Sequence, residues 1–113
     1  MTGVQTCALP ISLVDGIIFD HGRLNVLVHA AGVVADDLLA RASKASLRAV
    51  LSPKVAGALH LDEAVGTTAL DQFILVKSLA GVTGNVGQAG YAAANGFVAQ
   101  FARWRESRRM TGE

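Results

Sequence analysis

The chain has 113 residues, of which 51% are hydrophobic and 17% are charged, a composition that fits one modest globular domain and argues against extended disorder. Its formal net charge of +1 gives no electrostatic case for binding nucleic acid or an anionic membrane, and no apolar run approaches the ~20 residues that span a bilayer. The one cysteine, Cys7, excludes an internal disulfide and suits a reducing cytoplasm, and the three histidines lack the spacing of metal ligands.

The first twelve residues, MTGVQTCALPIS, do not fit the pattern of the rest of the chain. They have neither the basic segment nor the sustained apolar segment of a signal peptide. They resemble the in-frame translation of a common DNA-sequencing adapter, and the alternative is an ordinary disordered N-terminus. We therefore expect residues 1–12 to lie outside the fold and residues 13–113 to form it.

The next two segments predict a helix and a strand. Residues 13–22 read as the end of an amphipathic helix, with Gly22 as its stop. The apolar run in LNVLVHAAG, closed by Gly32, predicts a strand that is buried on both faces of a parallel sheet.

A long helical region and a second strand come next in the chain. Residues 36–65 carry leucines and valines at helical spacings, and Pro53 is expected to divide this region into two or three segments. The stretch DQFILVKS then predicts a second buried strand over residues 73–76.

The last part of the chain predicts a glycine-rich loop and a final helix that runs to about Arg108. The apolar face of that helix, expected to pack on the sheet, comprises Ala94, Phe97, Phe101 and Trp104. Strand, helical crossover, strand and helix make an α/β pattern with parallel strands. Ligands of such sheets bind beyond the carboxyl ends of the strands. HAAG, Ser78 and the start of the final helix should therefore meet at one edge.

The polar residues expected at that edge are the ones that the reduction of a ketone requires. A tyrosine phenol has an ordinary pKa of about 10, and a nearby ammonium lowers it toward a useful range. Tyr91 could then protonate the ketone oxygen, while the Ser78 hydroxyl hydrogen-bonds to it. Asn95, four residues after Tyr91, shares its helix face and could hold a lysine or a water.

Four stretches resemble the ketoreductase domain of modular polyketide synthases, a branch of the short-chain dehydrogenase/reductase superfamily: HAAGV, VLSPKVAGALHLDE, SLAGVTGNVGQAGYAAANGF and FARWRE. The similarity runs from about Gly22 to Arg105. Order and spacing also match, because a lysine is followed by a serine after 24 residues, a tyrosine after 13 more and an asparagine after four.

The resemblance implies a set of site residues and a reaction. The reaction is the NADPH-dependent reduction of a β-ketoacyl group, held on an acyl carrier protein, to a β-hydroxyacyl group, with other synthase domains in the parent chain. NADPH would be lined by HAAG, at Ala30, Ala31 and Gly32. The implied catalytic residues are Tyr91 as general acid, Ser78 as the donor that orients the carbonyl, Lys54 as the cation that lowers the tyrosine pKa, and Asn95 as the partner that positions the lysine.

The implied fold is a Rossmann-like, doubly wound parallel sheet. Its N-terminal strands, with their glycine-rich dinucleotide turn, and its final strands do not occur in these 113 residues. GNVGQAG does not have the G-x-G-x-x-G spacing. We therefore expect residues 13–113 to be the central portion of one ketoreductase domain, and the isolated chain to be inactive.

Three positions depart from or refine the family pattern. Lys77 stands where related domains usually have a second serine. Relatives that form the D-hydroxy product resemble one another in a Leu-Asp-Asp motif, of which this chain keeps only Asp36. Relatives that form the L-hydroxy product tend to have a tryptophan where this chain has Thr83. The resemblance therefore predicts the D-hydroxy product, with Asp36 as the stereocontrol residue.

Two other functions stay open. One is a catalytically silent, reductase-like structural domain, although such a domain would not need the four matching polar residues. The other is a free-standing reductase of the fatty-acid type. Those enzymes usually place their lysine four residues after the tyrosine, where this chain has Asn95.

Overall fold

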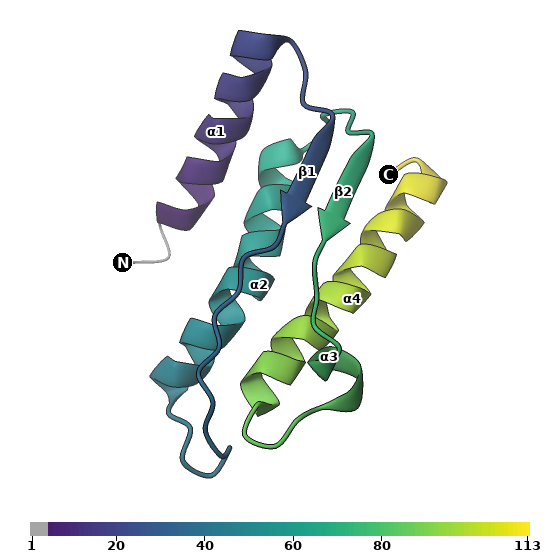
Figure 1. Ribbon diagram of the computed structural model, residues 1–113. Helices are drawn as coiled ribbons and strands as arrows, with labels where there is room; N and C mark the ends of the chain where they lie inside the picture. The colour runs from purple at the N-terminus through teal and green to yellow at the C-terminus, as the bar shows by residue number, and fades with distance from the viewer. Residues whose placement is uncertain (1–4) are drawn as a thin grey trace.

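The computed structural model describes residues 5–113, which form four helices and two strands (Figure 1). In chain order these elements are α1 (Gln5–His21), β1 (Val26–His29), α2 (Lys44–Val65), β2 (Gln72–Leu75), α3 (Ala80–Thr83) and α4 (Ala89–Thr111). The predicted order of helix, strand, helix, strand and final helix is confirmed. The short helix α3 lies in the segment that was expected to be a glycine-rich loop.

The first helix begins upstream of the boundary that the sequence predicted. Residues 5–12 are helical and continue into residue 13 without a break, and residues 1–4 lie outside the described residues. The predicted stop is confirmed, because the chain leaves the helix at Gly22, whose φ of 81° is readily adopted only by glycine.

The two strands are parallel, paired in register from Val26↔Gln72 to His29↔Leu75, and α2 forms the connection between them. Parallel pairing places both carboxyl ends at the same edge of the sheet. Figure 1 shows the chain leaving both strands in the same direction, toward α3 and the start of α4.

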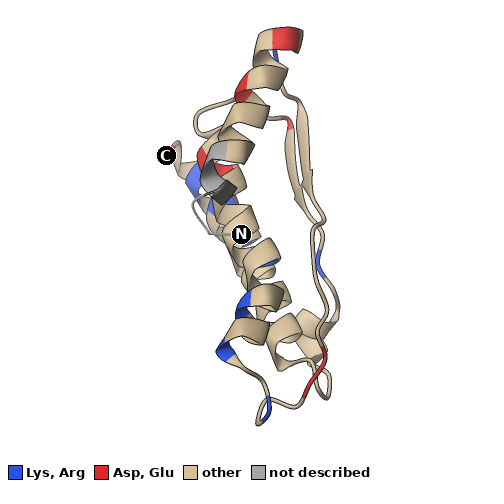
Figure 2. Ribbon diagram, turned by 90° about the vertical axis from the view of Figure 1, so that its left-hand side faces the viewer, with Lys and Arg blue, Asp and Glu red and all other residues tan. Residues whose placement is uncertain are grey.

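Only one face of the sheet is covered within the described residues. Seen from the side, the helices form a layer against one face of the strands, and the other face is bare (Figure 2). Leu27 and His29 point into this layer and are buried, whereas Val26 and Val28 alternate to the other face and are 44% and 56% exposed. The expectation of burial on both faces is therefore wrong for these residues, because strand side chains alternate and helices cover a single side.

The prediction that Pro53 divides the second helix is also wrong, because α2 is continuous through it. A proline removes one N–H from the helix, and here the helix packs against both α1 and α4, so tertiary contacts outweigh this loss.

The start of α2 is set by a capping box. The Ser43 hydroxyl accepts the Ser46 N–H at 3.0 Å, and the Ser46 hydroxyl accepts the Ser43 N–H at 3.0 Å.

The core lies between α4, α2 and the covered face of the sheet. Helix α4 packs mainly on α2 and more lightly on β2. Of the predicted apolar stripe, Ala94 and Phe101 are buried, but Trp104 is 44% exposed and Val98 takes its place in the core. The buried face is thus rotated slightly from the expected one, because the principal neighbour of α4 is a helix rather than the sheet.

Candidate active site

The candidate site is built around a single buried amide. The Asn95 side chain is 0% exposed in the second turn of α4. Its Oδ1 accepts the backbone N–H of Ser78 at 2.6 Å, and its Nδ2 donates to the backbone carbonyl of Tyr91 at 2.8 Å. One side chain therefore joins the segment after β2 to the first turn of α4. The sequence suggested that Asn95 holds a lysine or a water, whereas its bonds in the structure go to these two backbone groups.

The Ser78 hydroxyl lies just beyond the end of β2. It is half-buried, and its oxygen accepts the N–H of Ala80 at 3.2 Å. Because the oxygen is the acceptor in this bond, the hydroxyl hydrogen can still be donated to a ligand. The local turn that begins α3 thus orients the hydroxyl without using its donor.

Lys54 reaches the same edge from α2. The residue is 5% exposed, and its Nζ donates to the carbonyl of Val76, directly after β2, at 3.0 Å. Within residues 5–113 it forms no ion pair with a carboxylate. A buried ammonium that is hydrogen-bonded but not neutralised keeps its positive field, which favours the charged form of a nearby acid such as a phenol.

The loop after β1 passes over Lys54. Ala30, Ala31 and Gly32 are exposed, and a Cβ added at Gly32 would lie 3.3 Å from Lys54 Cε and 3.6 Å from its Nζ. The absence of a side chain at Gly32 therefore leaves room for the lysine. The small residues expected to line a nucleotide and the lysine expected to act in catalysis meet at this point.

Asp36 lies further along that loop and is tied to the segment before α4. Its Oδ1 accepts the side-chain N–H of Gln88 at 2.9 Å, and the Asp37 N–H donates to the carbonyl of Gly87 at 2.9 Å. Gln88 is three residues before Tyr91. Sequence reasoning missed Gln88, because nothing in the local pattern shows that two loops 52 residues apart are in contact.

His29 is a second residue of the site that sequence reasoning missed. It is 5% exposed at the end of β1, and its Nε2 is buried with no hydrogen-bond partner among the described residues. Burial, and then the positive charge of Lys54, lower the pKa of His29 below its ordinary value of 6.5. The signal in the sequence was the alternation along β1, which places His29 on the same face as Leu27.

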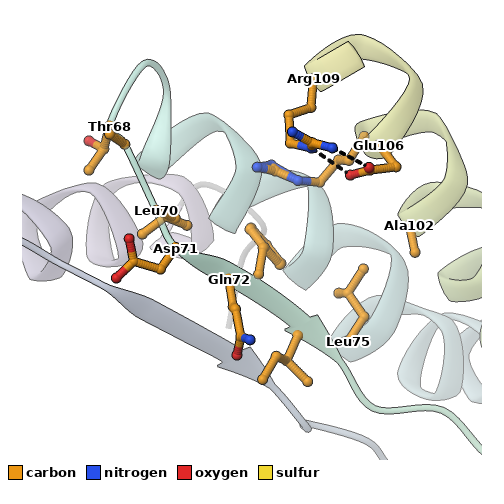
Figure 3. Close-up of a pocket in the computed structure, with 12 residues that line it drawn as sticks. Thr68, Leu70, Asp71, Gln72, Leu75, Ala102, Glu106 and Arg109 are labelled. Atoms are coloured by element: carbon orange, nitrogen blue, oxygen red, sulfur yellow. Dashed lines mark hydrogen bonds and ion pairs between the residues drawn. The ribbon is translucent and has the colours of Figure 1, made fainter.

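A cavity of about 600 Å³ lies away from this site, along the edge of β2 that does not pair with β1 (Figure 3). It is lined by residues 68–75 and by the last turns of α4, where Glu106 and Arg109 pair with each other. None of the predicted catalytic residues lines it. The candidate catalytic side chains therefore lie near the carboxyl ends of the strands rather than in this cavity.

Comparison with known proteins identifies the family. A family model described as the KR domain matches residues 11–112. The chain belongs to the KR domain family. It is 45% identical over 93 residues to the polyketide synthase PksN of Bacillus subtilis (strain 168), a match that covers 82% of this chain and 2% of PksN.

Solved ketoreductases have the same fold. A ketoreductase domain from the bacillaene assembly line matches with a TM-score of 0.87 and 39% identity, covering 91% of this chain and 25% of that structure. An N-terminal ketoreductase from the macrolactin assembly line matches with a TM-score of 0.83 and 37% identity, covering 91% and 21%. The predicted polyketide-synthase resemblance and the Rossmann-like α/β fold are confirmed, and the chain spans about a quarter or less of these structures.

Membrane spans and metal-ligand clusters are both absent from the part of the chain that the structure describes. Among residues 5–113, no helix combines the length and the apolar character needed to cross a membrane. In the same residues, no three His, Cys, Asp or Glu side chains are grouped as metal ligands would be.

Proposed function

We propose that this chain carries the catalytic residues of an NADPH-dependent β-ketoacyl reductase domain, which reduces a β-keto group on an acyl carrier protein to a β-hydroxy group. The observation that carries the proposal is the buried Asn95 amide, which joins the Ser78 and Tyr91 segments at the edge where Lys54 is buried without a carboxylate partner. The similarity to polyketide synthases supports the substrate class.

Ser78, Tyr91 and Lys54 each have a separate role in the proposed reaction. When bound, the reduced nicotinamide supplies a hydride to the ketone carbon. The Ser78 hydroxyl donates a hydrogen bond to the ketone oxygen, and the Tyr91 phenol transfers its proton to that oxygen as negative charge develops. The product hydroxyl then carries the tyrosine proton, and the positive charge of Lys54 stabilises the phenolate that remains.

The residues at the end of β1 fit a nicotinamide nucleotide. Ala30 and Ala31 have small, exposed side chains, and Gly32 presents bare backbone directly over Lys54. A larger side chain at Gly32 would press on the lysine and would also obstruct a flat ligand. We therefore assign Ala30, Ala31 and Gly32 to the nucleotide and Lys54 to the boundary between nucleotide and substrate.

Replacing Tyr91 tests the proposal most directly. In a complete ketoreductase domain that contains this chain, Tyr91→Phe should lower kcat by about 10²–10⁴-fold, the usual contribution of general acid catalysis. The affinity for NADPH should stay the same, because the phenol is not needed to bind the nucleotide. The measurements are NADPH oxidation with a β-ketoacyl thioester and a fluorescence titration with NADPH. The complete domain is required because we expect the isolated chain to be inactive.

Two outcomes would contradict the proposal in different ways. Near-native turnover by Tyr91→Phe would remove the tyrosine from the mechanism. A wild-type domain that is folded but does not reduce any β-ketoacyl thioester would favour the silent structural alternative.

The same assay reports the hand of the product. Asp36 is held by Gln88 three residues before the catalytic tyrosine, which supports a role for Asp36 beside the substrate. We propose that the domain forms the D-hydroxy product. Chiral analysis of the product measures this, and a predominantly L product would refute it.

A further inference from the structure

The short helix α3 lies unusually close to α4, and the contact is made through Gly81. A Cβ added at Gly81 would lie 2.8 Å from each of three atoms, namely the carbonyl carbon and Cβ of Asn95 and the amide nitrogen of Gly96. Side chains in folded proteins do not approach so closely. Two of these atoms are backbone inside a 23-residue helix, so they cannot move aside as the end of a flexible side chain would.

The same turn holds Ser78. The Gly81 N–H donates to the carbonyl of Ser78 at 3.2 Å, and the Ala80 N–H donates to the Ser78 hydroxyl at 3.2 Å. On the other side of the contact, Asn95 accepts the Ser78 N–H at 2.6 Å. The residue that Gly81 touches is therefore the residue that anchors Ser78, and any movement of α3 away from α4 must lengthen this hydrogen bond.

The glycine on the opposite side of the contact has no such requirement. A Cβ added at Gly96 would lie 3.7 Å from the carbonyl oxygen of Gly81, which is an ordinary van der Waals distance. Gly96 lies in the interior of α4, where alanine is the better helix former. Two glycines thus face each other across one contact, and only one of them is sterically necessary.

We propose that Gly81 is a positioning residue that sets the location of the Ser78 hydroxyl relative to Tyr91, an inference that rests on the proposed reductase function. Without a side chain at Gly81, α3 approaches α4 closely enough for the bond between Ser78 and Asn95. With a methyl group there, the contact must open from 2.8 Å to at least 3.0 Å, and to 3.4 Å for an ordinary van der Waals contact. A displacement of about 1 Å in a catalytic group can lower a rate by about 10²-fold.

The structural part of the proposal is tested without any enzyme assay. Amide hydrogen exchange of Ser78 is measured by NMR in the wild-type chain and in the matched variants Gly81→Ala and Gly96→Ala. We expect Gly81→Ala to accelerate exchange at Ser78 at least about tenfold, as loss of one hydrogen bond implies. Gly96→Ala should leave it unchanged. Unchanged exchange in Gly81→Ala, or equal acceleration in both variants, would overturn the proposal.

The catalytic part is tested in the complete ketoreductase domain. Gly81→Ala should lower kcat by about 10²-fold, with KM and the Kd for NADPH unchanged, whereas Gly96→Ala should keep kcat within about twofold. A general loss of structure would instead weaken NADPH binding as well. Equal kcat values for Gly81→Ala and the wild type would overturn the proposal.

A third variant keeps the proposal testable if Gly81→Ala does not fold. Asn95→Ala removes the acceptor of the Ser78 N–H but retains the Cβ against which Gly81 packs. It should reproduce both the faster exchange at Ser78 and the loss of kcat, and normal values of both would refute the proposal. If the wild-type domain is not a reductase but the exchange results hold, only the proposed function fails.

Discussion

Two cations in the helical layer have opposite surroundings. Lys54, on α2, is 5% exposed, and its ammonium is hydrogen-bonded to one backbone carbonyl, that of Val76. Arg105, near the end of α4, has a side chain that is 24% exposed, and it pairs with the carboxylate of Asp62. Its guanidinium also lies over the Phe73 ring, 4.2 Å from the centroid.

This difference fits the proposed catalytic role of Lys54 and a structural role for Arg105. A buried ammonium with a single neutral partner has lost hydration without full compensation, so it contributes little or nothing to stability. It does keep its electrostatic influence on nearby acids. The arginine is paired with a carboxylate, which largely cancels its field, and it also packs on an aromatic ring. The comparison predicts that removal of Lys54 affects the rate and removal of Arg105 affects the fold.

The largest effect is expected for Lys54→Met in the complete ketoreductase domain. This change removes the positive charge that we propose stabilises the phenolate left on Tyr91, so kcat should fall by about 10²-fold or more. The free energy of unfolding should be unchanged or higher, because a buried charge is replaced by an apolar side chain of similar length. Steady-state kinetics and thermal unfolding measure the two effects.

Lys77→Met is the matched control. Lys77 lies directly before Ser78 and is exposed to solvent, where water screens its charge. The kcat of the Lys77→Met variant should stay within about twofold of the wild-type value. If Lys77→Met lowered the rate as much as Lys54→Met, the special role of the buried lysine would be refuted.

The next effect is on stability. Arg105→Met leaves the half-buried Asp62 carboxylate with only the more distant Arg108, at 3.9 Å. We expect the free energy of unfolding to fall by about 1–3 kcal/mol, the usual cost of an unsatisfied buried polar group, with kcat per folded molecule unchanged. Denaturant unfolding measures this. Arg109→Met removes an exposed ion pair with Glu106 and should leave the unfolding midpoint unchanged. Equal effects of the two variants would contradict the assignment.

The smallest expected effect concerns pH and His29, which faces the same lysine. Its pKa is lowered in the folded chain, first by burial and then by the charge of Lys54. The unfolded chain therefore takes up the proton first as pH falls. The stability that comes from the neutral imidazole is complete above the ordinary pKa of 6.5 and is lost as pH decreases below it, by up to about 1.4 kcal/mol per pH unit.

Unfolding measured between about pH 7.5 and about pH 5 tests this prediction, because this range begins above the ordinary pKa of 6.5 and extends well below it. His29→Gln should reduce the dependence on pH, and His21→Gln, a change on the exposed last turn of α1, should keep it. An unchanged pH dependence in His29→Gln would show that other groups cause it.

The candidate site residues were easier to predict from the sequence than the residues that pack around them. The sequence predicts Lys54, Ser78, Tyr91 and Asn95 as site residues because their order and spacing match a family pattern that can be read directly along the chain. The residues that surround and support the site were not predicted. Gln88 binds Asp36 across 52 positions, His29 is buried against Gly57, and Gly81 packs on the backbone of α4. Each of these depends on a distance between segments that are remote in the sequence.

The sequence by itself determined the order of the main helices and strands, the parallel α/β class and the family, and it proposed the four candidate reactive side chains. These come from local periodicity, from turn-forming residues such as Gly22 and from motif spacing, all of which act over a few neighbouring positions. Only the tertiary structure decided that α2 continues through Pro53, that one face of the sheet is covered, and that Asn95 bonds to Ser78 and Tyr91. These features depend on which elements pack together, and packing contacts outweigh local preferences when the two disagree.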